Sequence, residues 1–117
     1  MNTRLIMKNN LRTEKAKRYI AKNYHKKLLI DELAGICHMG NSNFSRVFFM
    51  EYGLTVQEYI KQYRLNVAKK LLLTTKEKID YIAKFSGFHD KSYFFRSFKN
   101  ETSLTPSEFR EFNSLYP

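Results

Sequence analysis

The chain is poor in several residue types, and each shortage excludes a class of protein or of site. Its 117 residues include one cysteine, two prolines, four glycines and no tryptophan. Because Cys37 has no partner cysteine, an internal disulfide is excluded and nothing points to an oxidising compartment. Cys37 and His38 alone are too few for a metal site, which needs about three or four ligands.

Long hydrophobic runs and linker-like segments are also missing. No apolar run approaches the roughly 20 residues of a membrane-spanning helix, and no signal peptide is evident, so we expect a cytoplasmic protein. No segment alternates between apolar and polar residues as a strand does, and no stretch rich in glycine and serine divides the chain. The sequence therefore predicts an all-α fold.

Catalytic constellations are equally scarce. His25, His38 and His89 lie far apart in the sequence. No nucleophile with a matching base, no glycine-rich phosphate loop and no metal-ligand cluster accompanies them. We expect neither an enzyme nor a bound cofactor.

Acidic residues are outnumbered by basic ones. The chain has 21 Lys and Arg against 11 Asp and Glu, which gives a net charge of +10. The first 27 residues hold a single acid, Glu14, among nine cations: Arg4, Lys8, Arg12, Lys15, Lys17, Arg18, Lys22, Lys26 and Lys27. Such a field attracts polyanions, nucleic acid ahead of anionic lipid. A basic surface that serves only solubility is the alternative.

The most informative feature is an internal repeat, because residues 30–60 recur as residues 79–110. Ile30-Asp31 and Leu33-Ala34 recur forty-nine places on as Ile79-Asp80 and Ile82-Ala83. Seven further residues recur fifty places on: Phe44, Arg46, Phe48, Glu51, Leu54, Thr55 and Glu58 match Phe94, Arg96, Phe98, Glu101, Leu104, Thr105 and Glu108. The change of offset falls between Ala34 and Phe44, where a turn absorbs it. A repeated helix–turn–helix on a basic chain suits a DNA duplex.

Apolar spacing and capping residues predict about seven helices. They cover residues 13–24, 31–37, 41–52, 55–73, 79–86 and 90–102, with a last helix beginning near Pro106. Thr13, Asp31 and Asp90 are predicted caps, and Thr55 with Glu58 fits a capping box. In the helix over 55–73 the predicted apolar stripe is Val56, Ile60, Tyr63, Val67 and Leu71.

We therefore expect four parts along the chain. They are an N-terminal arm or linker (1–12), a first helix–turn–helix subdomain (13–54), a linker helix (55–73) and a second subdomain (74–117).

The second helix of each repeat is predicted to bury one face and present the other. At about 100° per residue, Phe44, Val47, Phe48, Glu51 and Tyr52 face inward in the first repeat, as do Phe94, Ser97, Phe98 and Glu101 in the second. The outward residues are Ser42, Asn43, Ser45, Arg46 and Phe49, and then Lys91, Ser92, Phe95, Arg96 and Lys99.

This outward chemistry suits base recognition. Arginine donates two parallel hydrogen bonds to guanine, Ser and Asn reach bases or phosphates, and Phe95 fits a thymine methyl. The alternative for Arg46 and Arg96 is a solvated or ion-paired surface position. Lys69, Lys70, Lys76 and Lys78 are equally compatible with phosphate contact and with plain solvation.

The same residues carry a family resemblance that covers about residues 13–112. In the second repeat it rests on Ile82-Ala83, Gly87-Phe88, Ser92-Tyr93-Phe94, Arg96, Phe98-Lys99, Thr105-Pro106 and Phe109-Arg110. In the linker helix it rests on Arg64-Leu65, Ala68 and Leu71-Leu72, and in the first repeat on Leu33-Ala34 and Phe44-Ser45-Arg46. With these motifs in this order, the chain resembles the DNA-binding region of the AraC/XylS family of bacterial transcription regulators.

The resemblance implies two helix–turn–helix subdomains that place their second helices in major-groove segments of promoter DNA. The base-reading positions it implies are Ser42, Asn43, Ser45 and Arg46, and Lys91, Ser92, Phe95 and Arg96. Members mostly activate transcription, often by touching RNA polymerase. Many carry a companion effector-binding or dimerisation domain, so the chain is either complete or the C-terminal part of a longer regulator.

Some positions depart from the family pattern. His38 and Ser103 stand where glycine is usual, and Phe109 stands where tyrosine is usual. Phe49 and Met50 replace frequent lysines, through local repacking or as contacts to a partner. The rival hypothesis is therefore a protein-interaction module with Phe49 and Met50 as anchors.

Overall fold

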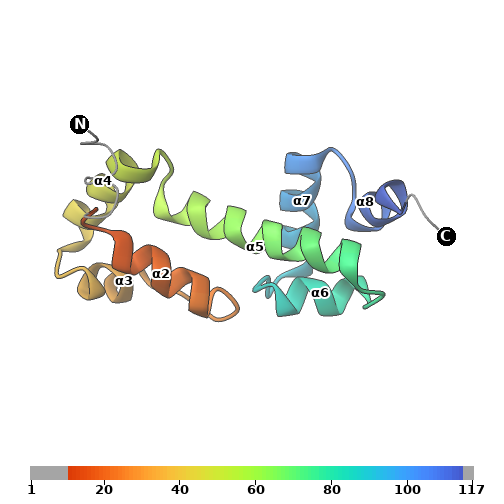
Figure 1. Cartoon of the computed structure of the whole chain (residues 1–117), viewed down its shortest axis with the longest axis horizontal. Helices are drawn as coiled ribbons and strands as arrows, with labels where there is room; N and C mark the ends of the chain where they lie inside the picture. The colour runs from red at the N-terminus through yellow and green to blue at the C-terminus, as the bar shows by residue number, and fades with distance from the viewer. Residues whose placement is uncertain (1–10, 115–117) are drawn as a thin grey trace, which may run out of the picture. The chain divides into compact units, whose positions relative to one another are not determined.

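Residues 11–114 are described by a computed structural model, and they form seven α-helices and no strand (Figure 1). The helices are α2 (Glu14–Asn23), α3 (Ile30–Ile36), α4 (Asn41–Tyr52), α5 (Val56–Thr74), α6 (Ile79–Phe85), α7 (Lys91–Thr102) and α8 (Pro106–Asn113). The predicted all-α fold is confirmed, with helix boundaries within one or two residues of the sequence-based ranges. The predicted N-terminal arm lies almost entirely outside the described residues.

The chain divides into two compact units, Met1–Ile60 and Lys61–Pro117, so that α5 contributes to both. The core of the first unit is formed by side chains of α2, α3, α4 and the start of α5: Ala16, Ile20, Leu33, Ala34, Phe44, Val47, Phe48, Val56 and Ile60. Phe44 and Phe48 are completely buried, as their inward prediction requires.

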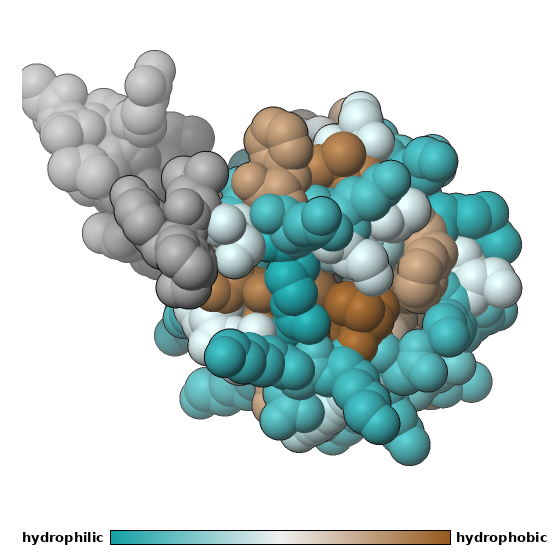
Figure 2. Space-filling view, turned by 90° about the vertical axis from the view of Figure 1, so that its right-hand side faces the viewer, coloured by the Kyte–Doolittle hydropathy of each residue, from teal (hydrophilic) through white to brown (hydrophobic). Residues whose placement is uncertain are grey.

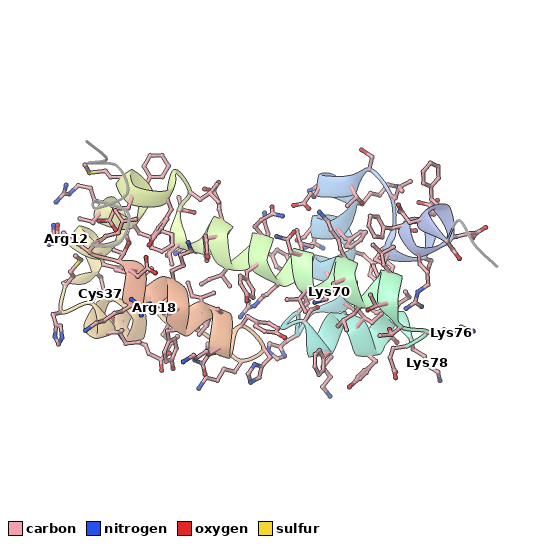
Figure 3. The ribbon with its side chains drawn as sticks, viewed as in Figure 1. Arg12, Arg18, Cys37, Lys70, Lys76 and Lys78 are labelled. Carbon is pink, nitrogen blue, oxygen red and sulfur yellow. The ribbon has the colours of Figure 1, made fainter. Side chains whose placement is uncertain are left out.

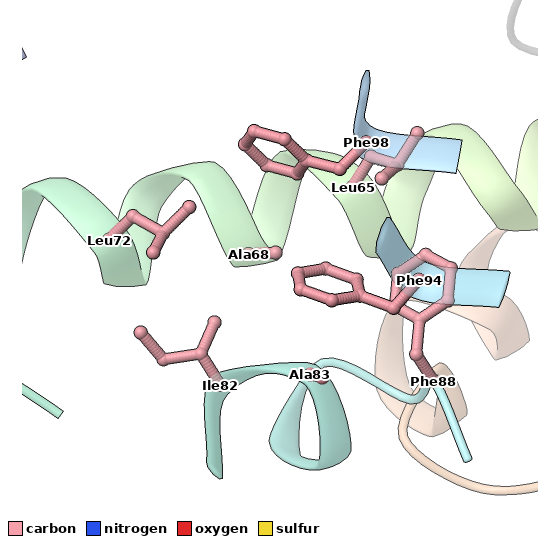
Figure 4. Close-up of a cluster of buried hydrophobic side chains, with 8 residues drawn as sticks. All are labelled: Leu65, Ala68, Leu72, Ile82, Ala83, Phe88, Phe94 and Phe98. Carbon is pink, nitrogen blue, oxygen red and sulfur yellow. The ribbon is translucent and has the colours of Figure 1, made fainter. Parts of the chain in front are cut away.

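The second unit is built around a cluster of eight buried residues (Figure 4). Leu65, Ala68 and Leu72 come from α5, Ile82 and Ala83 from α6, Phe88 from the turn, and Phe94 and Phe98 from α7. Phe109 of α8 packs against this cluster from outside. α6, the turn and α7 thus share one core that fixes how α7 is presented.

The sequence repeat is also a repeat of geometry inside each unit. Phe48 meets Tyr59 edge-on at 5.5 Å between ring centroids, and Phe98 meets Phe109 in the same way at 5.2 Å. The predicted capping box of Thr55 and Glu58 forms, and a second one that was not predicted forms at the matching residues Thr105 and Glu108. The Thr55–Glu58 and Thr105–Glu108 pairs each exchange two hydrogen bonds, of 2.9 and 3.1 Å. Residues fifty positions apart in the repeat therefore make the same kinds of contact in the two units.

The stripe predicted for α5 is right at its start and wrong further on. Val56 and Ile60 are buried, but the buried residues of the second half are Leu65, Ala68 and Leu72. Tyr63, Val67 and Leu71 are only partly buried. A single stripe assumes one core along the whole helix, whereas α5 supplies side chains to the core of each unit in turn.

Two of the predicted caps have other roles. Thr13 precedes α2 but makes no cap hydrogen bond, and its hydroxyl donates instead to Oε1 of Glu51 at 2.5 Å. Asp31 lies inside the first turn of α3, whose cap position is Leu29. Asp90 does cap its helix as predicted, since its carboxylate accepts from the backbone N–H of Tyr93 at 3.1 Å.

Glu51 thereby ties the end of α4 to the start of α2. Besides the Thr13 hydroxyl, its carboxylate accepts from the backbone N–H groups of Arg12 and Thr13, each at 2.9 Å. Burial by itself would raise the pKa of Glu51, but these hydrogen bonds outweigh it and hold the pKa below its ordinary value. The matching residue of the second unit, Glu101, pairs with Lys69 of α5.

The two positions where glycine is usual in the family have left-handed backbones. His38 has φ of 57° in the first turn, and Ser103 has φ of 68° after α7. Gly53, the counterpart of Ser103 after α4, has φ of 76°. A side chain in this conformation costs roughly 1–2 kcal/mol, so both non-glycine residues carry local strain.

Replacing Ser103 with glycine should therefore stabilise the protein. We expect a gain of about 0.5–1 kcal/mol in the free energy of unfolding, because relief of backbone strain exceeds the extra chain entropy of glycine. Urea denaturation measures it. The matched control is Gly53→Ala, whose added Cβ meets no atom within 4 Å and which should lose about 1 kcal/mol through its backbone alone. Equal stability of Ser103→Gly and the parent would contradict the strain.

Candidate nucleic-acid interface

The outward face of α4 carries the first set of predicted base-reading residues. Ser42, Ser45 and Arg46 are exposed, and Asn43 is half-buried. The guanidinium of Arg46 donates from Nη2 to Oδ1 of Asn43 at 2.6 Å and from Nη1 to Sδ of Met50 at 3.6 Å. The arginine thus lies along its own helix, and the rest of its five N–H donors remain available to a ligand.

The outward face of α7 carries the second set. Lys91, Ser92, Arg96 and Lys99 are all exposed. Unlike Arg46, Arg96 makes no hydrogen bond or ion pair with any residue in the part of the chain that the structure describes. Its guanidinium can therefore meet a base edge without first leaving another partner.

Phe95 differs from its prediction, because its ring is not simply turned outward. It is half-buried, packs against the core cluster of the second unit and meets Phe94 edge-on at 5.8 Å. A large aromatic side chain next to Phe94 gains more by covering the core than by standing in water. Only its exposed part is left for a contact with a base.

The first residue of each outward helix contacts an acid of the preceding helix, which the sequence did not predict. Nζ of Lys91 lies 2.9 Å from Oδ1 of Asp80 in α6. In the first unit, Nδ2 of Asn41 donates to Oδ1 of Asp31 in α3. The internal repeat could have indicated these contacts, since Asp31 matches Asp80 and position 41 matches position 91. They were not predicted because an acid in the first turn of a helix is normally explained by its effect on that helix alone.

Four lysines lie near the end of α5 and the start of α6, and they differ in whether they form an ion pair. Lys69 is ion-paired with Glu101. Lys70, Lys76 and Lys78 (Figure 3) are exposed and have no ion-pair partner between residues 11 and 114. These three remain available to phosphates.

Large hydrophobic side chains are exposed in both units. Phe49 is 53% exposed and Met50 70%, so two neighbouring apolar side chains of α4 lie at its surface. In the second unit, Tyr93 is half exposed, with its ring 5.9 Å from that of Phe88. In Figure 2, hydrophilic residues cover most of the displayed face and hydrophobic ones form small separate patches.

Among residues 11–114, no group of three or more His, Cys, Asp or Glu side chains is arranged to hold a metal ion. No helix in this range is both long and apolar enough to cross a membrane.

Comparison with known proteins identifies the family. A family model described as a helix-turn-helix domain matches residues 33–111. A relative from Bacillus subtilis, the bifunctional transcriptional activator/DNA repair enzyme AdaA, is 39% identical over 97 residues. That match covers 83% of this chain but 46% of the relative, so the chain spans less than half of that protein.

Solved structures agree with the fold. The C-terminal domain of AraT, a response regulator from Geobacillus stearothermophilus, matches with a TM-score of 0.83 at 26% identity over 91% of this chain and 90% of that one. The DNA-binding domain of the global transcriptional factor AdpA, solved in complex with a target DNA, gives a TM-score of 0.83 over 87% of this chain and 92% of that one. At 20% identity, this second likeness concerns the fold alone.

The fold, the paired outward helices and the family match together define a helix–turn–helix DNA-binding protein. The chain belongs to the AraC/XylS family of transcription regulators. The family resemblance seen in the sequence is confirmed, and the rival interpretation as a protein-interaction module is not favoured.

Proposed function

We propose that this chain binds one specific operator by inserting α4 and α7 into successive major-groove segments of the same duplex. The observation that carries the proposal is the repeated geometry. In each unit α4 or α7 buries one face through a matching edge-on aromatic contact, and it exposes polar side chains and one arginine on the opposite face. The target DNA bound by the similarly folded AdpA domain is in line with it.

The residues that make these contacts are proposed to be those of the two outward faces: Ser42, Asn43, Ser45 and Arg46 on α4, and Lys91, Ser92, Phe95, Arg96 and Lys99 on α7. Arg96 would make a bidentate contact with guanine, since its guanidinium is exposed and uncommitted. Lys70, Lys76 and Lys78 would contact phosphates, which position the protein without carrying sequence information.

The regulatory consequence is proposed to be activation. AdaA is a transcriptional activator by name, and this chain matches less than half of it. We therefore propose contact with RNA polymerase at the promoter and an effector-binding or dimerisation domain beyond this chain. Such a regulator would work in the cytoplasm, by binding and without catalysis.

Removing the guanidinium of Arg96 tests the proposed base contact. Arg96→Ala should lose roughly 1–3 kcal/mol of operator affinity and relax the preference at one base pair, because a bidentate guanine contact supplies about that discrimination. The measurement is selection of bound duplexes from a random pool, followed by titration of the selected site with the parent and the variant.

The matched control is Arg18→Ala on α2. Arg18 is also exposed, and its partner is Glu14 of the same helix, at 3.6 Å. This variant should keep the selected sequence unchanged. If Arg96→Ala selects the parental site with parental affinity, Arg96 does not contact a base. If the parent enriches no site from the pool, the proposed operator binding is wrong.

A further inference from the structure

The first residue of α7 is held by an acid from the preceding helix. Nζ of Lys91 pairs with Asp80 and also lies 5.8 Å from the ring centroid of Phe95. The pair borders an open hollow of about 330 Å³ whose lining includes Lys84 and His89. A phosphate that enters this hollow would meet Lys84 and Lys91 together, and it would find Asp80 already bound to one of them.

The first unit has the same tie without the cation. Asp31 corresponds to Asp80, but its partner at the start of α4 is the neutral amide of Asn41. In both units, therefore, the carboxylate contacts the first residue of the next helix. Only in the second unit does it neutralise a charge that belongs to the proposed DNA-contacting set.

We propose that Asp80 is a positioning residue that acts as an internal counterion for Lys91 and competes with DNA for it. The inference rests on the proposed function, in which Lys91 contacts the duplex. Asp80 orients the ammonium beside Phe95 before DNA arrives, and it reduces the charge that any duplex can recruit. The pairing of Asp80 with Lys91 thereby lowers the electrostatic affinity of the second unit for DNA.

The weakness of this pair makes the exchange feasible. The side chains of Lys91 and Asp80 are 62% and 70% exposed, so solvent screens their attraction. An approaching phosphate carries a full negative charge and can displace Asp80 at little cost. Separating Lys91 from Asp80 then cancels part of the free energy that the contact between Lys91 and the phosphate contributes.

Neutralising Asp80 tests this role. Asp80→Asn keeps the shape of the side chain and should raise affinity for a labelled random-sequence duplex about 2- to 5-fold, the range expected for an exposed ion pair. It should also steepen the slope of log affinity against log salt by up to about 0.9, since one more cation becomes available to release a counterion. Asp80→Glu should restore parental affinity and slope, which a purely structural role of Asp80 would not require.

Two comparisons separate this mechanism from a general loss of negative charge. Asp31→Asn removes the matching carboxylate, whose partner is neutral, and should leave the salt slope unchanged. In a Lys91→Ala background, Asp80→Asn should have no further effect on affinity or slope. Equal effects of Asp31→Asn and Asp80→Asn, or a persistent effect of Asp80→Asn without Lys91, would overturn the inference.

Failure of the counterion role and failure of the proposed DNA binding give different results. If Lys91→Ala weakens binding and Asp80→Asn changes neither affinity nor slope, the counterion role is wrong and the proposed DNA contact stands. If Lys91→Ala leaves binding unchanged, Lys91 does not contact DNA and the inference is wrong with it. If the parent binds no duplex, the proposed function itself fails.

Discussion

Operator binding should weaken by ~10³-fold or more when salt is raised from about 50 to about 200 mM, provided that roughly six phosphates are engaged. Each phosphate neutralised by Lys or Arg releases condensed counterions, so that added salt opposes every contact. The net charge of +10 and the exposed Lys70, Lys76 and Lys78 supply the cations. Fluorescence anisotropy with the selected operator, repeated across a salt series, gives the slope.

Two lysine variants make this result specific. Lys76→Ala should reduce the magnitude of the slope by roughly 0.9, the contribution of one phosphate contact. Lys69→Ala is the matched control and should not, because the ammonium of Lys69 is already committed to Glu101. A loss of affinity under about tenfold across the same range would mean that few phosphates are bound, in conflict with an electrostatically driven complex.

Truncating Phe98 should destabilise the protein by about 3–5 kcal/mol, which is a large part of the stability of a small domain. Phe98 is completely buried. The centroid of its ring lies 5.7 Å from that of Phe94 and 5.2 Å from that of Phe109, so Phe98 joins α7 to α8 within the second unit. Phe98→Ala would leave a cavity that these rings cannot fill. Thermal and urea denaturation measure the loss.

The same substitution at Phe112 provides the control. Phe112 lies in α8 of the same unit but is 74% exposed, so its truncation should change the free energy of unfolding by no more than about 0.5 kcal/mol. Because α7 is held in place by this core, Phe98→Ala should also weaken DNA binding, whereas Phe112→Ala should not. Comparable unfolding free energies for the two variants would contradict the central role of Phe98.

Local chemistry made most of the helices predictable. The Thr55–Glu58 capping box was predicted from its spacing, and it forms both of its hydrogen bonds, as do the matching residues Thr105 and Glu108. Gly53 ends α4 with a left-handed backbone, with φ of 76°, which glycine adopts without a steric cost. Caps and turns depend on residues within about four positions of each other, so the sequence displays them directly.

Side-chain partners across helices were harder to predict. Thr13 bonds Glu51 in place of its own helix, and Lys69 bonds Glu101. Each of these pairs joins residues more than thirty positions apart. Periodicity gives the face of a helix on which a residue lies, but it does not give the group opposite that face.

For the candidate interface, the sequence determined most of the residues that turn outward on α4 and α7, because helical spacing around a buried phenylalanine leaves little choice. It also determined the family, through motifs kept in order along the chain. The tertiary structure alone decided that Arg46 lies along its helix while Arg96 is uncommitted, that Phe95 leans on the core, and that Asp80 holds Lys91. These outcomes depend on distances between separate helices, and only packing fixes those distances.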